Sequence, residues 1–476
     1  MASEIRVNKI ENRSGLGTVT FADTGVDLAG IVTATTFSGS GASLTNVPDS
    51  ALSAVTASKL SGALPAISAA SLTNVPAANV VGVHTSLTVT NATTTGTAVV
   101  GGGVTISESG IEASGIGITC ANINGTQIGG RRNLIINGAM EISQRATTST
   151  TDGFATLDRF KTSSTGTDES PTQEQADVAA GTTPYTSGFR KCFKLTNGNQ
   201  TSGAGAGDRM EIQYMLEAQD VAKSGWNYTS ASSFITLSFW MKSSVAQAFF
   251  VRLQTQDGTQ YRYKTSTGSL SADTWTKITK TIPGNSNLQF DNNGNAGLRI
   301  SFYAFAGTNF SDSSATDTWA ANETGNRTND MTSTWYTTND ATLEVTGVQL
   351  EVGSQATAFE FRSNGEELKL CQRYFQKYIA PRLRGVIGSS STAVNRMGMT
   401  LITEMRANPS ATWSGNQSIY DGGGTATITA IAAPYVDHVS FEMDATISGT
   451  MDSGSGSCVC SYLDGNEATL SLDAEL

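Results

Sequence analysis

The sequence predicts an all-β protein that forms an elongated trimeric fibre. We expect a β-rich shaft, a jelly-roll sandwich domain, one short helix and a C-terminal β tip domain. Residues 1–130 are rich in Gly, Ser, Thr, Ala and Val, whereas all six Trp come later in the chain. From residue 131 onward, apolar and polar residues alternate in many short segments, which is typical of strands with one buried face. One segment only has the spacing of a helix.

The composition limits the classes of partner. A chain of 476 residues suggests about three domains. Charged residues are 15% of the chain, against ~25% in typical proteins, so solubility depends on uncharged polar side chains. The net charge is -11 and no cluster of Lys and Arg stands out in the sequence, so we expect no nucleic-acid partner and no anionic lipid. No apolar run is long enough for membrane insertion, and the start lacks the apolar core of a signal peptide.

The cysteines do not form a disulfide framework. Their number is odd and their positions are scattered: Cys120, Cys192, Cys371, Cys458 and Cys460. On a strand, Cys458 and Cys460 would point to the same face, which is poor geometry for a bond between them. We therefore expect free thiols, made in a reducing cytoplasm.

Residues 1–30 predict a small β unit. Ile10 falls in one apolar segment and Val19 and Phe21 in the next, with Gly15 and Gly17 as the turn between them. The alternative is an ordinary frayed terminus that contains a hairpin.

Residues 31–130 predict a repetitive trimeric shaft. The seven residues 42–48 recur unchanged at 70–76, and such repetition indicates a quasi-one-dimensional structure. The apolar residues are small and sparse, so a single copy would not offset an ordering cost of roughly 1–2 kcal/mol per residue. Intertwining of three identical chains would give each apolar stripe two partners. A flexible linker is the alternative.

Residues 131–362 predict the jelly-roll sandwich, because strand patterns recur without helical stretches. In the segment 234–242, alternate positions are Ile, Leu, Phe and Met. Phe249, Val251 and Leu253 alternate with Phe250 and Arg252, and Leu298, Ile300 and Phe302 alternate with Arg299, Ser301 and Tyr303. Trp240 and Trp275 fall within strand patterns, so we expect them in the core.

Residues 363–378 predict a connecting helix. Ser363 can cap its start, and Glu366 lies three residues on, which makes a capping box. Cys371, Phe375 and Tyr378 fall on one stripe of that helix. Residues 379–476 then predict a C-terminal β tip domain.

Several motifs resemble one family, the tail-fibre (receptor-binding) proteins of bacteriophages. The run Asn-Leu-Ile-Ile-Asn-Gly-Ala-Met at 133–140, followed by Asp158-Arg159-Phe160, is similar to the start of their globular part. The segments 366–375 and 404–409 resemble their helix and C-terminal part. Residues 9–12 and 33–41 are similar to the attachment end and shaft of cyanobacterial-phage fibres. The segments 238–242, 273–277 and 345–351 resemble carbohydrate-binding-module-like jelly rolls.

Catalytic and metal sites have little support in the sequence. The two His, His84 and His438, lie far apart, although His84 repeated at a three-fold axis would offer three metal ligands. Residues 291–302 resemble a calcium-binding loop but lack the Gly and Glu of an EF-hand. We expect no cofactor, and structural calcium in the jelly roll is the alternative. Glycosidases need two facing carboxylates, and the candidates lie in polar loops: Asp291, Asp312, Asp317, Glu323 and Asp330.

Aromatic residues in polar loops are the candidate carbohydrate-binding residues, since sugars stack their C–H faces on aromatic rings. Five such residues stand out: Trp319, Trp335, Tyr336, Trp413 and Tyr420. The alternative is that these rings anchor loops to the domain surface.

The resemblance implies a homotrimeric tail fibre located on the virion and made in the cytoplasm of an infected bacterium. Its N terminus would attach to a tail or baseplate protein, and its head would bind host surface polysaccharide without catalysis. Two alternatives remain open: a tailspike-like polysaccharide depolymerase, and a purely structural virion appendage.

Overall fold

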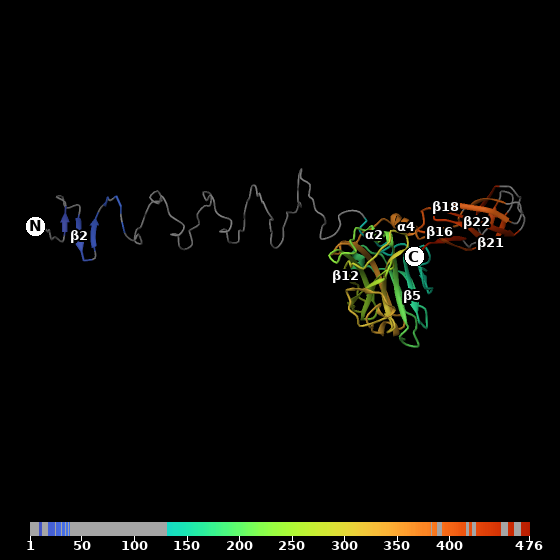
Figure 1. Cartoon of the computed structure of the whole chain (residues 1–476), viewed down its shortest axis with the longest axis horizontal. Coiled ribbons are helices and arrows are strands. Elements are labelled where there is room, and N and C mark those ends of the chain that lie inside the picture. The colour runs from blue at the N-terminus through green and yellow to red at the C-terminus, as the bar shows by residue number, and fades with distance from the viewer. Residues whose placement is uncertain are drawn as a thin grey trace. The chain divides into compact units, whose positions relative to one another are not determined.

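The computed structural model divides the chain into two compact units, Met1–Ile111 and Glu112–Leu476 (Figure 1). It describes residues 9–11, 18–23, 25–29, 31–33, 35–36, 38, 131–381, 383–387, 393–415, 418–420, 425–448, 456–460 and 468–476. Most of the predicted shaft, its repeat and His84 lie outside the described residues. None of the described helices is long and apolar enough to cross a membrane.

The first unit contains an antiparallel three-stranded sheet, with β1 (Lys9–Glu11), β2 (Thr18–Ala22) and β3 (Gly25–Ala29) in that order. Ile10 lies opposite Val19, and Val19 lies opposite Leu28. The predicted pairing of the two apolar segments is therefore confirmed.

Two antiparallel six-stranded sheets form the sandwich of the second unit, so the predicted all-β sandwich is confirmed. Sheet I has the order β14 (Trp319–Ala321), β11 (Tyr261–Ser269), β10 (Ala248–Thr255), β13 (Ala296–Ala306), β8 (Arg209–Glu217) and β5 (Phe160–Thr165). Sheet II has the order β12 (Thr276–Pro283), β9 (Phe234–Ser243), β15 (Thr342–Val352), β7 (Lys191–Thr196), β6 (Thr172–Asp177) and β4 (Thr148–Ser149).

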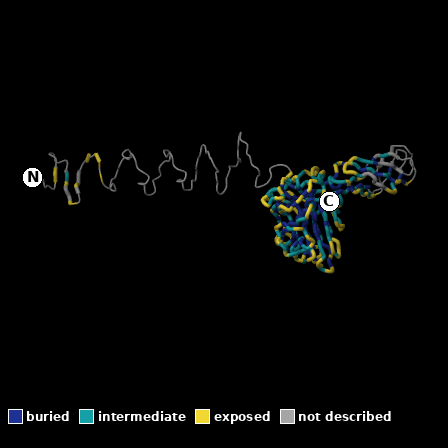
Figure 2. The backbone as a smooth tube through the Cα atoms, viewed as in Figure 1, coloured by how far each residue is buried: buried dark blue, intermediate teal, exposed yellow. Residues whose placement is uncertain are grey.

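The core lies between the two sheets and follows the predicted alternation of strand residues. Phe239 of β9 and Phe302 of β13 are fully buried, with ring centroids 5.0 Å apart. Figure 2 shows this buried interior in dark blue. Burial of a side chain of this size contributes about 1.5–3 kcal/mol. Trp275 and Trp240 pack in a smaller cluster, where Trp275 is buried and Trp240 only half-buried.

Short helices interrupt the strands, which corrects the expectation that residues 131–362 contain none. They are α1 (Thr183–Thr186), α2 (Ala218–Ala222), η5 (Thr324–Asn326) and α3 (Thr334–Thr337). Each is at most five residues long, too short to show a helical period in the sequence.

The connecting helix begins as predicted and ends early. In α4 (Asn364–Gln372), Ser363 and Glu366 form the expected capping box. Phe375 and Tyr378 are not helical, because they belong to strand β16 (Phe375–Ile379). Aromatic residues favour strands, and pairing of Tyr378 with Leu470 satisfies the backbone there.

The C-terminal region forms a small sheet and a barrel. The sheet has the order β16, β24 (Thr469–Asp473) and β19 (Ser410–Ser414). The closed barrel comprises β17 (Arg384–Ile387), β18 (Ala393–Thr400), β22 (Ser440–Ser448), β21 (Thr425–Val436), β20 (Ser418–Tyr420) and β23 (Gly456–Cys460). After β24 the chain returns to the sandwich, where Glu475 forms an ion pair with buried Arg159.

Candidate functional site

Three of the five predicted binding aromatics lie in the core, which corrects the expectation that they are exposed loop residues. Trp335 and Tyr336 of α3 are each 0% exposed. The Trp335 indole donates a hydrogen bond to the Thr342 carbonyl at 3.0 Å, and Tyr336 stacks on Phe305. The Trp319 indole donates to the Pro283 carbonyl at 2.7 Å. These rings anchor polar loops, so their faces do not meet solvent.

The other two predicted aromatics lie in the C-terminal region. Trp413 of β19 is half-buried, with its ring centroid 5.9 Å from that of Phe441. Tyr420 ends β20, and its side chain lies outside the described residues. Binding by Trp413 and Tyr420 therefore stays a prediction, separate from the sandwich.

The side of sheet I that points away from the core is a polar face. The strand alternation that buries Phe249 and Ile300 turns the intervening residues to this face. Tyr303 of β13 lies opposite Glu211 of β8, and Ser301 lies opposite both Gln213 of β8 and Arg252 of β10. The face thus carries donors and acceptors side by side on neighbouring strands.

Six cationic side chains gather on or beside this face, and we call them the cationic face. Arg252 lies opposite Lys264 of β11, and the next row brings Arg299 and Arg262 to either side of Gln254. Arg209 and Arg327 hold the Phe310 ring between them, 5.1 and 4.9 Å from its centroid. The set is Arg209, Arg252, Arg262, Lys264, Arg299 and Arg327.

A long segment, residues 307–333, covers part of the polar face. Lys264 donates to the Thr328 carbonyl at 3.1 Å and forms an ion pair with Asp312 of this segment. Arg262 donates to the Ser314 hydroxyl at 2.6 Å. As a result Arg252 is only 1% exposed and Tyr303 is 0% exposed.

Several buried polar atoms of the face have no hydrogen-bond partner among the residues that the structure describes. They include Nε and Nη2 of Arg252, Nε and Nη1 of Arg262, and the Tyr303 hydroxyl. A buried polar group without a partner costs about 1–3 kcal/mol. A ligand that supplies acceptors at this surface would satisfy these donors.

The electrostatics of the face depend on mutual repulsion among its cations. Burial and then the nearby Arg252 lower the pKa of Arg299. Burial also lowers the pKa of Arg262, although Asp312 opposes this effect. Burial alone would raise the pKa of Glu211, but Arg252 and Arg209 hold it below its ordinary value. Glu211 therefore stays ionised, with Oε1 3.1 Å from Nε of Arg209.

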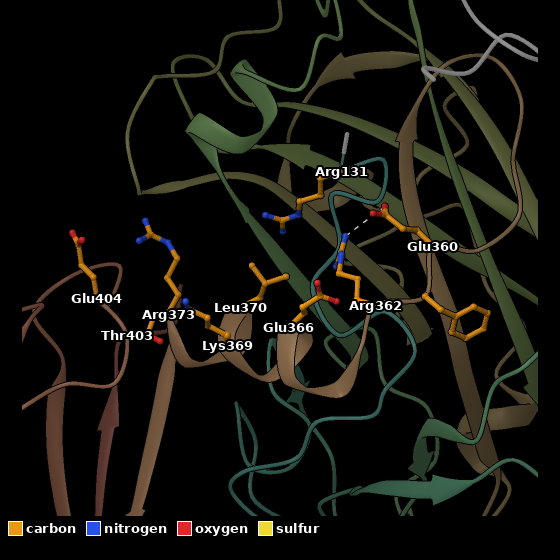
Figure 3. A pocket seen from close by; sticks show the side chains of 10 residues that line it. Arg131, Glu360, Arg362, Glu366, Lys369, Leu370, Arg373, Thr403 and Glu404 are labelled. Carbon is orange, nitrogen blue, oxygen red and sulfur yellow. Dashed lines mark ion pairs between the residues drawn. The ribbon is translucent and has the colours of Figure 1, made fainter. Parts of the chain in front are cut away.

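A second candidate is an open cleft of about 750 Å³ beside helix α4 (Figure 3). Arg131, Lys369 and Leu370 line it together with Thr403 and Glu404 from the C-terminal region.

Most of the charges in this cleft have partners within the protein. Arg362 forms ion pairs with Glu360 at 3.7 Å and Glu367 at 3.3 Å. Arg373 makes a two-point contact with Glu217, at 2.7 and 2.9 Å. We therefore regard this cleft as a contact region between α4 and the C-terminal region, and as a weaker binding candidate than the polar face.

Among the predicted loop carboxylates, Asp291 lies beside a second carboxylate, because its backbone N–H donates to Asp257 at 3.1 Å. Asp312 contacts Lys264, Asp317 accepts a hydrogen bond from Thr265 at 2.6 Å, and Asp330 accepts one from Ser311 at 2.6 Å. Within the described ranges, no group of three or more His, Cys, Asp or Glu side chains is placed to hold a metal ion. Calcium in the jelly roll therefore stays untested.

The comparisons with known proteins give a remote likeness. No family model and no curated protein matches the sequence. One similar solved structure is the enzymatically active domain of tailspike protein 4 of bacteriophage CBA120, at 9% identity over 46% of this chain and 21% of that chain, with TM-score 0.25. The match thus spans about a fifth of the tailspike domain's length.

Two carbohydrate-binding domains are also similar. The cellulose-binding domain of Cellulomonas fimi β-1,4-glucanase C matches at 11% identity over 45% of this chain and 99% of that one, with TM-score 0.22. A family 11 module of a Clostridium thermocellum cellulase matches at 13% identity over 44% and 96%, with TM-score 0.21. The carbohydrate binding named in these two descriptions is said of those two proteins alone.

Proposed function

We propose that this protein is a non-catalytic fibre protein of a bacteriophage virion that adheres to polysaccharide on the host cell surface. The observation that carries the proposal is the polar face of sheet I, with its buried and unpartnered hydrogen-bonding groups. Sugar hydroxyls both donate and accept hydrogen bonds, so they match a surface that mixes Arg252, Glu211 and Tyr303.

The lowered pKa of the carboxylate on the polar face supports binding without catalysis at that face. Hydrolysis of a glycosidic bond needs a carboxylic acid whose pKa is raised, together with a second carboxylate. Glu211, the carboxylate that sheet I contributes to the face, has a lowered pKa. Burial raises the pKa of Asp158 to about 7, but Asp158 is wholly buried against Gln144 and Arg145.

The resemblance of the sequence to tail fibres supports the remaining parts of the proposal. Residues 1–30 attach the protein to a tail or baseplate protein, and residues 31–130 form the shaft of a homotrimer. Three heads on one shaft bind together, so avidity adds roughly 10²–10⁴ to the affinity of a single site.

The test is binding of the purified full chain to intact bacteria, cyanobacteria included, before and after their surface polysaccharide is stripped. Arg252→Met is the test variant, because Met fills similar space without the charge. Lys277→Ala is the matched control, because Lys277 is an exposed cation on sheet II. We expect stripping to abolish binding, Arg252→Met to weaken it about tenfold, and Lys277→Ala to leave it unchanged. Wild-type binding that survives stripping contradicts the proposal.

Two further measurements separate the alternatives. Release of reducing sugar ends from host polysaccharide by the wild-type protein would indicate a depolymerase. Purified protein that neither binds any susceptible host nor blocks infection would indicate a structural appendage.

A further inference from the structure

We infer that the cationic face takes an acidic polysaccharide, one whose sugars carry carboxylate or sulfate groups. This inference rests on the proposed function and narrows its ligand class. Neutral polysaccharide would satisfy the hydroxyl and amide groups of the face, but it would leave the surplus of positive charge there without counter-charges.

The balance of charge on the face is the first argument. The chain as a whole has a net charge of -11, yet six cations gather here. Two carboxylates lie at ion-pair distance from them, Glu211 beside Arg209 and Asp312 beside Lys264. Glu323 and Asp330 act on the face only through weaker attraction, to Arg262 and Lys264. The face therefore holds a local surplus of positive charge.

The unpartnered guanidinium nitrogens are the second argument. Arg252 lies at the centre of the face, 5.5 Å from the centroid of the Tyr303 ring. Its Nε and Nη2 are both buried without a partner, as are Nε and Nη1 of Arg262. Nε and Nη2 of Arg252 are neighbouring donors in a planar fork that fits the two oxygens of a carboxylate or sulfate, whereas Nε and Nη1 of Arg262 point to different sides of its guanidinium group. Neutral hydroxyl groups do not reproduce that geometry.

The access to the face is the third argument. Arg209, Arg299 and Arg327 are half-buried, whereas Arg252 and Arg262 are buried. An acidic polysaccharide therefore meets these three partly exposed cations first. Displacement of Asp312 from Lys264 by a ligand carboxylate would exchange one ion pair for another. Lys264 would thus keep an ionic partner while the ligand is bound.

The experiment measures binding of the full chain to four immobilised probes: alginate, dextran sulfate, neutral dextran and single-stranded DNA. We expect alginate or dextran sulfate to bind about tenfold or more tightly than neutral dextran, because each charge-assisted hydrogen bond strengthens binding about ten- to a hundredfold. Whichever of the two binds more tightly identifies the anionic group. About 0.5 M NaCl should weaken this binding strongly, since salt screens the attraction.

The variants assign the effect to this face. Arg252→Met and Arg299→Met should each weaken acidic-probe binding about tenfold, while Lys277→Ala should not change it. Arg299 is half-exposed, so its replacement keeps the test valid if Arg252→Met perturbs folding. Unchanged binding by both variants overturns the inference.

The outcomes also separate this inference from the proposed function. Two outcomes would overturn the acidic ligand class and leave the adhesion function unchanged. One is polysaccharide-dependent binding to cells that added NaCl does not weaken. The other is binding of neutral dextran as tight as that of the acidic probes. Preference for DNA over both acidic polysaccharides overturns the inference in favour of a nucleic-acid partner. Absence of binding to every probe and every cell overturns both proposals.

Discussion

Replacement of Arg252 by Met should make the sandwich more stable and should also weaken its binding of the ligand. Arg252 is buried, and two of its nitrogens lack hydrogen-bond partners. Each such group costs about 1–3 kcal/mol in the folded state. Glu211 loses one favourable charge in the variant, but it keeps Arg209 at 3.1 Å. We therefore expect a net gain of about 2 kcal/mol in the free energy of unfolding, after this loss is set against the two relieved donors.

The assay is urea or thermal unfolding followed by tryptophan fluorescence. Five of the six Trp lie between residues 131 and 362, so the signal reports chiefly on the sandwich. For a domain of this size, a gain of about 2 kcal/mol raises Tm by about 4–8 °C. Lys277→Ala should leave Tm within the error of the wild type. A fall in Tm for Arg252→Met would refute the reasoning, because it would mean that the guanidinium group is satisfied in the folded protein. Stability and binding would then no longer oppose each other at this residue.

The remaining predictions concern the core, the helix cap and pH. Trp335→Ala should cost about 3–5 kcal/mol in urea unfolding, because it removes a fully buried ring, and any protein that remains folded should still bind. Ser363→Ala should cost about 1 kcal/mol by the same measurement, since it removes the cap of α4. Burial raises the pKa of Asp158 to about 7, so the folded protein keeps a proton that the unfolded chain releases. Stability should therefore fall as pH rises from about 4 to about 7, and Asp158→Asn should flatten that fall in urea midpoints measured against pH.

The strands of the sandwich were predictable because their signal is local. A period of two in residues 234–242 and 298–302 requires only the sequence of each segment, and both runs face the core as expected. The end of α4 was not predictable in this way. Phe375 and Tyr378 continue a helical stripe, but their pairing with Asp473 and Leu470 depends on a strand almost a hundred residues away. Long-range pairing overrode the local period.

The aromatic candidates were misplaced for a related reason. Trp335 and Tyr336 lie among Thr, Ser and Asn, which in a sequence indicates an exposed loop. In the structure this polar loop turns its two large rings inward, and the Trp335 indole nitrogen finds a backbone carbonyl there. A polar neighbourhood in sequence therefore says little about which side of a loop a bulky ring faces.

The cationic face was hidden because it exists only after the sheet has formed. Arg209, Arg252, Arg262 and Arg299 come from four strands. Three of them are the only cation in their strand, and Arg262 shares β11 with Lys264. The alternation within each strand predicts that Arg252 and Arg299 point away from the core. The strand order of sheet I then brings them together. An acidic chain with few charges can thus carry a concentrated cationic surface. The net charge of the chain gives no general attraction to polyanions, so an acidic ligand at this face has to be recognised by geometry as well as by charge.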